Sequence, residues 1–244
     1  EKLTSLAREE NKTFIVRSDM PLNCGSRTSY HVKQSIALDP DLDVVGKKMK
    51  RTTKQNIRAA EKNGVIVTFS RDRSQMEAYY QLQVETRRRH GLPVQPHNFF
   101  SQIQKHVIEP GFGSIVLASV DGTIAAGMVM FHWKETVIAK YAASHSQFWK
   151  FRPNNLVFWE AIKWSCQNGY TYFDMGRSNN EDEGLQRYKQ SWGANSTPLY
   201  YSNMAESVCS RPEKQPPKWM QAFIQKAPCI VCKTTGALIY KYFG

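Results

Sequence analysis

A carboxylate and a guanidinium follow a short aromatic segment in the second half of the chain. Tyr172 and Phe173 lead into Asp174, Gly176 and Arg177, and this order predicts a strand that ends where the two charged groups emerge together. Strand ends are where α/β proteins usually place their sites. The pair can bind a substrate, or it can form an ion pair that fixes the turn. A paired Asp would be a poor base, because a nearby cation lowers its pKa. Both interpretations are open.

A lysine lies on the helix expected after this turn. Residues 181–183 supply the negative charge that a helix N-terminus favours, and Leu185, Tyr188 and Trp192 recur at helical spacing on an apolar face. Lys189 adjoins Tyr188, which this spacing predicts to be buried, within reach of the same strand end. An ammonium aimed at an oxygen that becomes anionic can stabilise a transition state. From the residues alone, a surface lysine beside a packing tyrosine is the favoured interpretation.

A basic segment supplies a second group of candidates. Residues 47–62 predict a single helix with cations three or four apart on one side and apolar residues on the other. The cations are Lys47, Arg51, Lys54, Arg58 and Lys62. One interpretation is the solvated face of a packed helix. The other is that one or two of these cations face a phosphate group.

The composition is that of a globular protein with an excess of positive charge. The 244 residues are 41% hydrophobic and 12% aromatic, enough for one large core or two modest ones. A formal net charge of +12 predicts attraction to a nucleotide, RNA or an anionic membrane without choosing among them. No uncharged apolar run reaches about 18 residues, so no transmembrane helix is expected. The five scattered cysteines favour a reducing compartment, hence the cytoplasm, with the inner face of the membrane as an open alternative.

Helices and strands alternate along the chain. Strands are predicted at 13–17, 31–38, 65–69, 113–120, 123–133, 135–143 and 197–203, and helices at 73–90, 97–107 and 153–168. Asn63 and Gly64 are typical of a helix C-cap, and Gly169 follows the end of another helix. Asp121 and Gly122 predict a tight hairpin, so the three middle strands form an antiparallel meander.

This order of elements resembles the GNAT acyltransferase lobe, and four blocks are similar to the signature of the FemAB family. The blocks are VGKKMKRTTKQNIRAAEKNGV, LPVQPHNFF, FRPNNLVFWEAIKWSCQNGYTYFDMGRS and GLQRYKQSWGA. The resemblance covers nearly everything from about Asp43 onward, and the closing segment is similar to FemAB-related proteins of exopolysaccharide and exosortase systems. It implies an α/β (α+β) fold, a GNAT-like lobe with a mixed, centrally antiparallel sheet flanked by helices.

FemAB proteins pair two GNAT-like lobes in one chain, and the matching lobe is the second. The resemblance therefore implies that residues 1–40 are a junction with a missing first lobe, a partner from the same protein. Residues 41–210 would form the acyltransferase lobe, and residues 211–244 a Pro-rich linker with a C-terminal helical tail.

The function that the resemblance implies is N-acyl transfer. The acceptor would be an amine on a small molecule or on a lipid- or nucleotide-linked cell-wall or polysaccharide precursor. The donor is an aminoacyl-tRNA in the cell-wall branch and an acyl-CoA in ordinary GNAT enzymes, in each case a co-substrate and not a permanently bound cofactor. In the family, an aromatic-Lys pair precedes an aromatic-Gly pair, and here these are Tyr188, Lys189, Trp192 and Gly193. Lys189 is thus the expected catalytic stabiliser, with Tyr188 shaping the pocket.

The remaining candidates are expected to bind substrate. Arg152, Asn154 and Asn155 begin a helix after the meander, where GNAT folds present backbone N–H groups to a pyrophosphate. The chain lacks the Gly-rich loop of acyl-CoA-binding members there, which argues against CoA and leaves other phosphate ligands open. The other candidates for this role are Asp174, Arg177, Trp192, Lys54, Arg58 and Tyr141. His145 is a candidate base because histidine titrates near neutral pH, although an ordinary polar loop residue is the commoner case.

The tail leaves a last alternative open. After the linker RPEKQPP, apolar residues including Trp219, Phe223, Ile230 and Leu238 alternate with lysines, and they could dock on the missing lobe or lie on an anionic membrane. Cys229 and Cys232 lack the partners of a zinc site, so no metal is expected.

Two classes of function other than acyl transfer remain open. One is a non-catalytic module on the same fold that binds RNA or a nucleotide-sugar, and the other is a membrane-surface scaffold in polysaccharide export.

Overall fold

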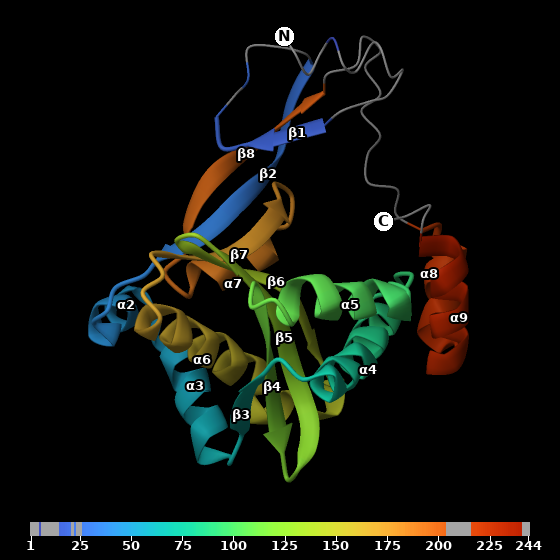
Figure 1. Ribbon diagram of the computed structural model, residues 1–244, viewed down its shortest axis with the longest axis horizontal. Helices are drawn as coiled ribbons and strands as arrows, with labels where there is room; N and C mark the ends of the chain where they lie inside the picture. The colour runs from blue at the N-terminus through green and yellow to red at the C-terminus, as the bar shows by residue number, and fades with distance from the viewer. Residues whose placement is uncertain (1–4, 6–14, 21, 23–25, 204–215, 241–244) are drawn as a thin grey trace. The chain divides into compact units, whose positions relative to one another are not determined.

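The computed structural model describes residues 5, 15–20, 22, 26–203 and 216–240 (Figure 1). The chain divides into two compact units. The first comprises Glu1–Ile36 and Asp174–Pro212, and the second Ala37–Phe173 and Glu213–Gly244. The boundaries expected at residues 40 and 210 stay a prediction, and most of the Pro-rich linker lies outside the described residues.

The second unit is built on an antiparallel sheet. Its strands follow the order β6-β5-β4-β3, and each is antiparallel to the next. They are β3 (Ile66–Ser70), β4 (Gly113–Val120), β5 (Thr123–Trp133) and β6 (Thr136–Ser144). Asp121 and Gly122 turn from β4 into β5 with φ of 49° and 76°, as a two-residue hairpin requires. The meander that the sequence predicts is confirmed.

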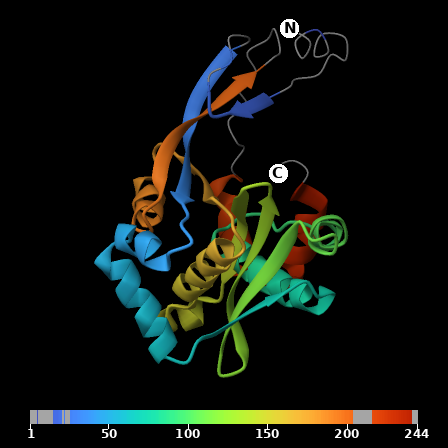
Figure 2. The same cartoon turned by 60° about the vertical axis from the view of Figure 1, so that its left-hand side comes forward.

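Helices pack on this sheet. Those of the second unit are α2 (Leu42–Lys48), α3 (Arg51–Lys62), α4 (Arg73–Arg89), α5 (His97–Ile103), α6 (Pro153–Gln167), α8 (Lys218–Lys226) and α9 (Cys229–Ile239). Both α4 and α6 contact the strands, and α3 lies beside α6 (Figures 1 and 2). Almost every residue of β4 is buried, on both faces of the strand. The helix expected at 97–107 is α5 followed by a π-helical turn, Gln104–Ile108.

The single helix expected over residues 47–62 is wrong. Met49 and Lys50 are extended, with ψ of 142° and 149°, and they separate α2 from α3. The break places the Met49 side chain in the interior, where it is 5% exposed. Lys47 therefore belongs to α2, and the rest of the expected basic stripe lies on α3.

The C-terminal helices complete the core of the second unit. Ile224, Ala227 and Cys232 join the buried cluster around α4, α5 and β4, and α8 and α9 both contact α4. Trp219 and Ile230 on the same two helices are 69% and 71% exposed. No helix in the described ranges is long and apolar enough to cross a membrane, and those ranges contain no group of three His, Cys, Asp or Glu side chains that could hold a metal.

The core around β5 should be intolerant of one added methyl group. A Cβ built on Gly127 would lie 2.6 Å from Leu117 Cδ2, 3.1 Å from Tyr79 Cδ2 and 3.1 Å from the Val116 carbonyl oxygen. Gly127→Ala is expected to lower the free energy of unfolding by about 1–3 kcal/mol because these groups must move apart. Gly46→Ala is the matched control, since no atom lies within 4 Å of that Cβ. Urea denaturation of both variants tests this, and equal effects would contradict it.

The first unit carries strands in the order β1-β8-β2-β7, together with one described helix. The elements are β1 (Ile15–Ser18), β2 (Ser26–Ala37), β7 (Tyr172–Asn179), α7 (Glu183–Gln190) and β8 (Asn195–Asn203). Strand β8 is antiparallel to both β1 and β2. Residues 13 and 14 of the first expected strand lie outside the described residues, and β2 begins five residues before its expected start at His31.

Candidate functional site

Lys189 is buried in the first unit. Asp182 caps the N-terminus of α7, and its carboxylate accepts a hydrogen bond from the Leu185 amide at 3.0 Å. Of the three residues expected on the apolar face, Trp192 is buried, but the expectation is wrong for Leu185 and Tyr188, which are 38% and 37% exposed. Lys189, by contrast, is 5% exposed. Helical spacing predicts that the Lys189 side chain faces solvent. The contacts that its ammonium makes with residues distant in the sequence explain why it is buried.

The Lys189 ammonium is held by two backbone carbonyls of β7. Its Nζ donates to the oxygens of Gly176 at 2.8 Å and Arg177 at 2.9 Å. A lysine ammonium has three N–H donors, and among the described residues these two carbonyls are its acceptors. One donor is therefore left for a ligand oxygen.

Burial also changes the proton affinity of this lysine. It lowers the pKa of Lys189 to about 8, and the nearby carboxylates of Asp174 and Asp182 oppose that shift. Because the pKa remains above 7, the side chain is mostly a cation at neutral pH. A partly desolvated cation with one free donor is suited to an oxygen that gains negative charge during a reaction.

Asp174 fixes the backbone that holds Lys189. Its Oδ1 accepts a hydrogen bond from the Gly176 amide at 2.7 Å, and Gly176 has φ of 75°. The strand expected to end at these residues continues to Asn179, so that expectation is wrong. The positive φ of Gly176 changes the course of the backbone inside the strand without ending it. Asp174 thus stabilises the β7 backbone conformation in which the Gly176 and Arg177 carbonyls face the Lys189 ammonium.

Arg177 belongs to a neighbouring polar cluster. Its Nη1 donates to the Tyr201 hydroxyl at 2.5 Å and lies 3.1 Å from His31 Nε2. A guanidinium only donates, so Nε2 of His31 is the acceptor. The rings of His31 and Tyr201 lie 4.8 Å apart. Sequence reasoning missed both partners, because β2 and β8 carry them from distant parts of the chain.

Trp192 lies in the core of the first unit. Its side chain is 0% exposed, and its ring centroid is 6.4 Å from that of Tyr188. Trp192 is therefore positioned to support Tyr188 and α7, and its place among the substrate-binding candidates stays a prediction.

Removing the Trp192 side chain should destabilise the protein more than it affects any ligand. Trp192→Ala is expected to lower the free energy of unfolding by about 3–5 kcal/mol, because a fully buried indole leaves a cavity. Trp133 is 61% exposed, and Trp133→Ala is expected to change stability by about 0.5 kcal/mol or less. Chemical denaturation followed by circular dichroism compares the two, and a small effect at Trp192 would show that the site tolerates its loss.

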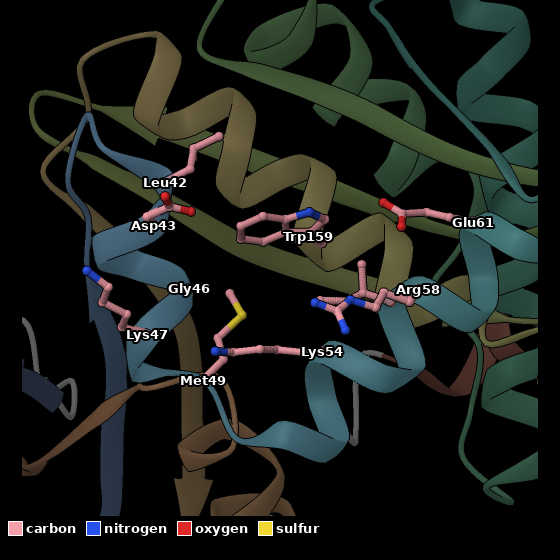
Figure 3. A pocket seen from close by; sticks show the side chains of 10 residues that line it. Leu42, Asp43, Gly46, Lys47, Met49, Lys54, Arg58, Glu61 and Trp159 are labelled. Carbon is pink, nitrogen blue, oxygen red and sulfur yellow. The ribbon is translucent and has the colours of Figure 1, made fainter.

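The candidates Lys54 and Arg58 lie in the second unit, at a cavity of about 500 Å³ between α2, α3 and α6 (Figure 3). In Figure 3 the Lys54 side chain extends from α3 toward Met49, and the Arg58 guanidinium points toward the indole of Trp159. The lining residues are Leu42, Asp43, Gly46, Lys47, Met49, Lys54, Ile57, Arg58, Glu61 and Trp159. Trp159 is a residue that the sequence reasoning missed.

The start of α6 is also in the second unit. Arg152 precedes Pro153 with φ of 59°, is exposed, and accepts a hydrogen bond from the Asn155 amide at 3.0 Å. Asn154 and Asn155 are half-buried in the first turn. Helix α6 begins at Pro153 as the sequence predicts, and the binding role of these side chains stays a prediction.

Tyr141 and His145 lie along and just after β6. The register of β5 and β6 shifts at Lys140, a β-bulge one residue before Tyr141. The Tyr141 ring packs 5.5 Å from Phe100, and burial raises its pKa to about 12. His145 Nε2 lies 3.0 Å from the Glu85 carboxylate, and its Nδ1 is buried with no hydrogen-bond partner among the described residues. His145 therefore presents no accessible free nitrogen, which favours the structural interpretation over a base.

Comparisons with known proteins agree with this fold. A family model described as an acetyltransferase (GNAT) domain matches residues 47–190. The structure is similar to FemX, with a TM-score of 0.70 and 15% identity over 83% of this chain and 74% of FemX. L-PGS from Bacillus licheniformis gives a TM-score of 0.63 and 15% identity, covering 93% of this chain and 77% of its own.

The structure is also similar to the C-terminal domain of a putative lysylphosphatidylglycerol synthetase from Agrobacterium fabrum. Its TM-score is 0.64 at 12% identity, covering 84% of this chain and 72% of that one. A search of curated proteins found no match. At these identities the likeness to solved structures is one of fold. The GNAT-like, FemAB-like fold expected from the sequence is confirmed.

Proposed function

Because the chain belongs to the family of acetyltransferase (GNAT) domains, we propose that it is an N-acyltransferase of FemAB type that transfers an acyl or aminoacyl group to an amine acceptor. The fold is that of acyl and aminoacyl transferases in general. The bond formed would be an amide, and Lys189 would be the residue that lowers the barrier.

The buried ammonium of Lys189 is the observation that carries the proposal. In amide formation, the lone pair of a neutral amine attacks the donor carbonyl carbon, and the carbonyl oxygen becomes anionic. Lys189 has a free N–H donor and a charge shielded from water, with two carbonyls fixing its direction. The oxyanion then re-forms the carbonyl and expels the thiolate or ribose oxygen of the donor. The proton lost by the amine passes to that leaving group or to water.

Two donors are candidates, an acyl-CoA and an aminoacyl-tRNA. We favour the aminoacyl donor on two grounds. The turn at Arg152 before α6 lacks the glycine run of acyl-CoA sites, and one of the similar structures is named a putative lysylphosphatidylglycerol synthetase, a name that contains an aminoacyl group. Either donor would be a co-substrate. The acceptor would be an amine on a cell-wall or polysaccharide precursor, lipid-linked acceptors included.

A transfer assay with each donor tests this function. The full-length protein is incubated with labelled aminoacyl-tRNA or acyl-CoA and a panel of amines, and the amide is detected by mass spectrometry. Turnover with one donor, lost in Lys189→Met, is the expected result. Absence of amide with both donors and every amine would overturn the enzyme proposal and leave a binding module on the same fold.

A further inference from the structure

The cavity between α2, α3 and α6 combines three kinds of side chain, each of which suits one part of a nucleotide. Cationic groups bind phosphate, an aromatic face stacks on a base, and carboxylates accept hydrogen bonds from ribose hydroxyls. The lining supplies all three kinds: Lys47, Lys54 and Arg58, then Trp159, then Asp43 and Glu61.

The two central cations are available to a ligand. Lys54 and Arg58 are one turn apart on α3, and in the part of the chain that the structure describes neither is joined to an acidic side chain. The first turn of α3 contains no acidic residue either. In Figure 3, Asp43 and Glu61 lie on opposite sides of the group of lining side chains, with Lys54 and Arg58 between them. Positive charge is therefore concentrated at the centre of the cavity, where a phosphate would be attracted most strongly.

The indole of Trp159 supplies the flat surface. Trp159 is only partly buried although α6 packs on the sheet, and its side chain borders the cavity (Figure 3). Lys163, one turn along α6, lies 5.8 Å from the ring centroid and is paired with Glu160 at 2.6 Å. A base stacked on the part of the ring that borders the cavity would gain apolar contact and dispersion energy.

We propose that this cavity is a nucleotide-binding site, with the base on Trp159 and the phosphate groups on Lys54 and Arg58. Its volume of about 500 Å³ lies within the range of about 300–1,000 Å³ that is usual for small-molecule sites. An inorganic phosphate or a lipid phosphate would use the cations but would leave the indole without a stacking partner. The proposal does not depend on acyl transfer, because binding is measured without donor or acceptor.

Calorimetric titration of the full-length protein with ADP, UDP and inorganic pyrophosphate tests the proposal. ADP or UDP is expected to bind at least about tenfold more tightly than pyrophosphate, because only the nucleotides have a base to stack. Preference for one base would identify the substrate class further. A free nucleotide and a nucleotide-sugar share this chemistry, and a titration with a UDP-sugar distinguishes them by its affinity relative to UDP.

Variants of the lining residues locate the site. Trp159→Leu is expected to weaken nucleotide binding by about tenfold and Trp159→Phe by much less, because phenylalanine keeps an aromatic face. The double variant Lys54→Gln with Arg58→Gln should also weaken binding by about tenfold or more, since two charge-assisted contacts are lost. The matched controls are Lys62→Gln on the same helix and Trp133→Leu, both outside the lining, and neither should change affinity.

Four results would overturn the proposal. Equal affinity for pyrophosphate and the nucleotides would show that the cavity binds phosphate groups without recognising the base. Equal weakening by the controls Lys62→Gln and Trp133→Leu would show nonspecific attraction to a positively charged protein. Binding of an RNA oligomer without measurable binding of a mononucleotide would indicate a nucleic-acid surface. Absence of any binding at low ionic strength would exclude a nucleotide site. Thermal unfolding of each variant confirms that it is folded.

Discussion

Lys189→Met is expected to lower kcat by about 10²- to 10³-fold, equivalent to about 2.7–4 kcal/mol of lost transition-state stabilisation. Methionine keeps an unbranched apolar side chain in a position that is 5% exposed, so the interior remains filled while the N–H donors are lost. The KM for the donor should change far less, because the oxygen that Lys189 stabilises carries full negative charge only in the reaction. Steady-state kinetics with the donor identified in the transfer assay measure both constants.

Arg187→Met on the same helix is the matched control. This variant also removes a positive charge from α7, but the Arg187 side chain is 70% exposed and pairs with Glu183 at 3.4 Å. Its kcat should stay close to that of the unmodified chain. Equal losses in the two variants would show that the effect comes from the charge of α7 as a whole, and an unchanged kcat in Lys189→Met would remove Lys189 from the mechanism.

The parts of the fold that the sequence predicts well are those set by local chemistry. Asp121 and Gly122 turn the chain within two residues, and the hairpin is found where these residues predict it. Pro153 and Gly169 bound α6 because one lacks an amide hydrogen at the helix start and the other takes a positive φ just beyond the helix end. No distant part of the chain has to be known for these predictions.

The site is harder to predict because distant segments create it. Helical spacing places Tyr188 inside and Lys189 outside α7, yet two carbonyls of β7 satisfy the ammonium and reverse that order. Trp159 is about 100 residues from Lys54 and Arg58 along the chain, and only the packing of α3 on α6 places it at the same cavity. The resemblance to FemAB proteins identified Lys189 as a candidate, whereas spacing alone predicted a surface side chain.

Turnover is expected to fall as the pH rises through about 8, the pKa to which burial lowers Lys189. Above the pKa, the charged fraction of Lys189 decreases by about tenfold for each pH unit. If the charged form stabilises the oxyanion, the rate decreases in the same proportion. The acceptor amine has the opposite dependence, so the profile is compared with that of Lys189→Arg. Arginine stays charged. The kcat of the unmodified chain divided by that of Lys189→Arg should therefore fall above pH 8, as Lys189 loses its proton. A ratio that rises through pH 8 would indicate that Lys189 acts as a base.

The same lysine predicts how stability depends on pH. Its pKa is about 8 in the folded chain against 10.5 for an ordinary lysine, so between these two values the unfolded chain binds more protons. The free energy of unfolding should therefore rise with pH across that window, and the cost of burying the charge is fully present below pH 8. Lys189→Met should abolish this rise. Asp174→Asn should start it at a lower pH, because the Asp174 carboxylate raises the lysine pKa. Denaturation measured from pH 7 to 10 tests the sign: a flat profile in the unmodified chain would mean that the ammonium is not buried in solution, and the kinetic fall above pH 8 would then need another cause.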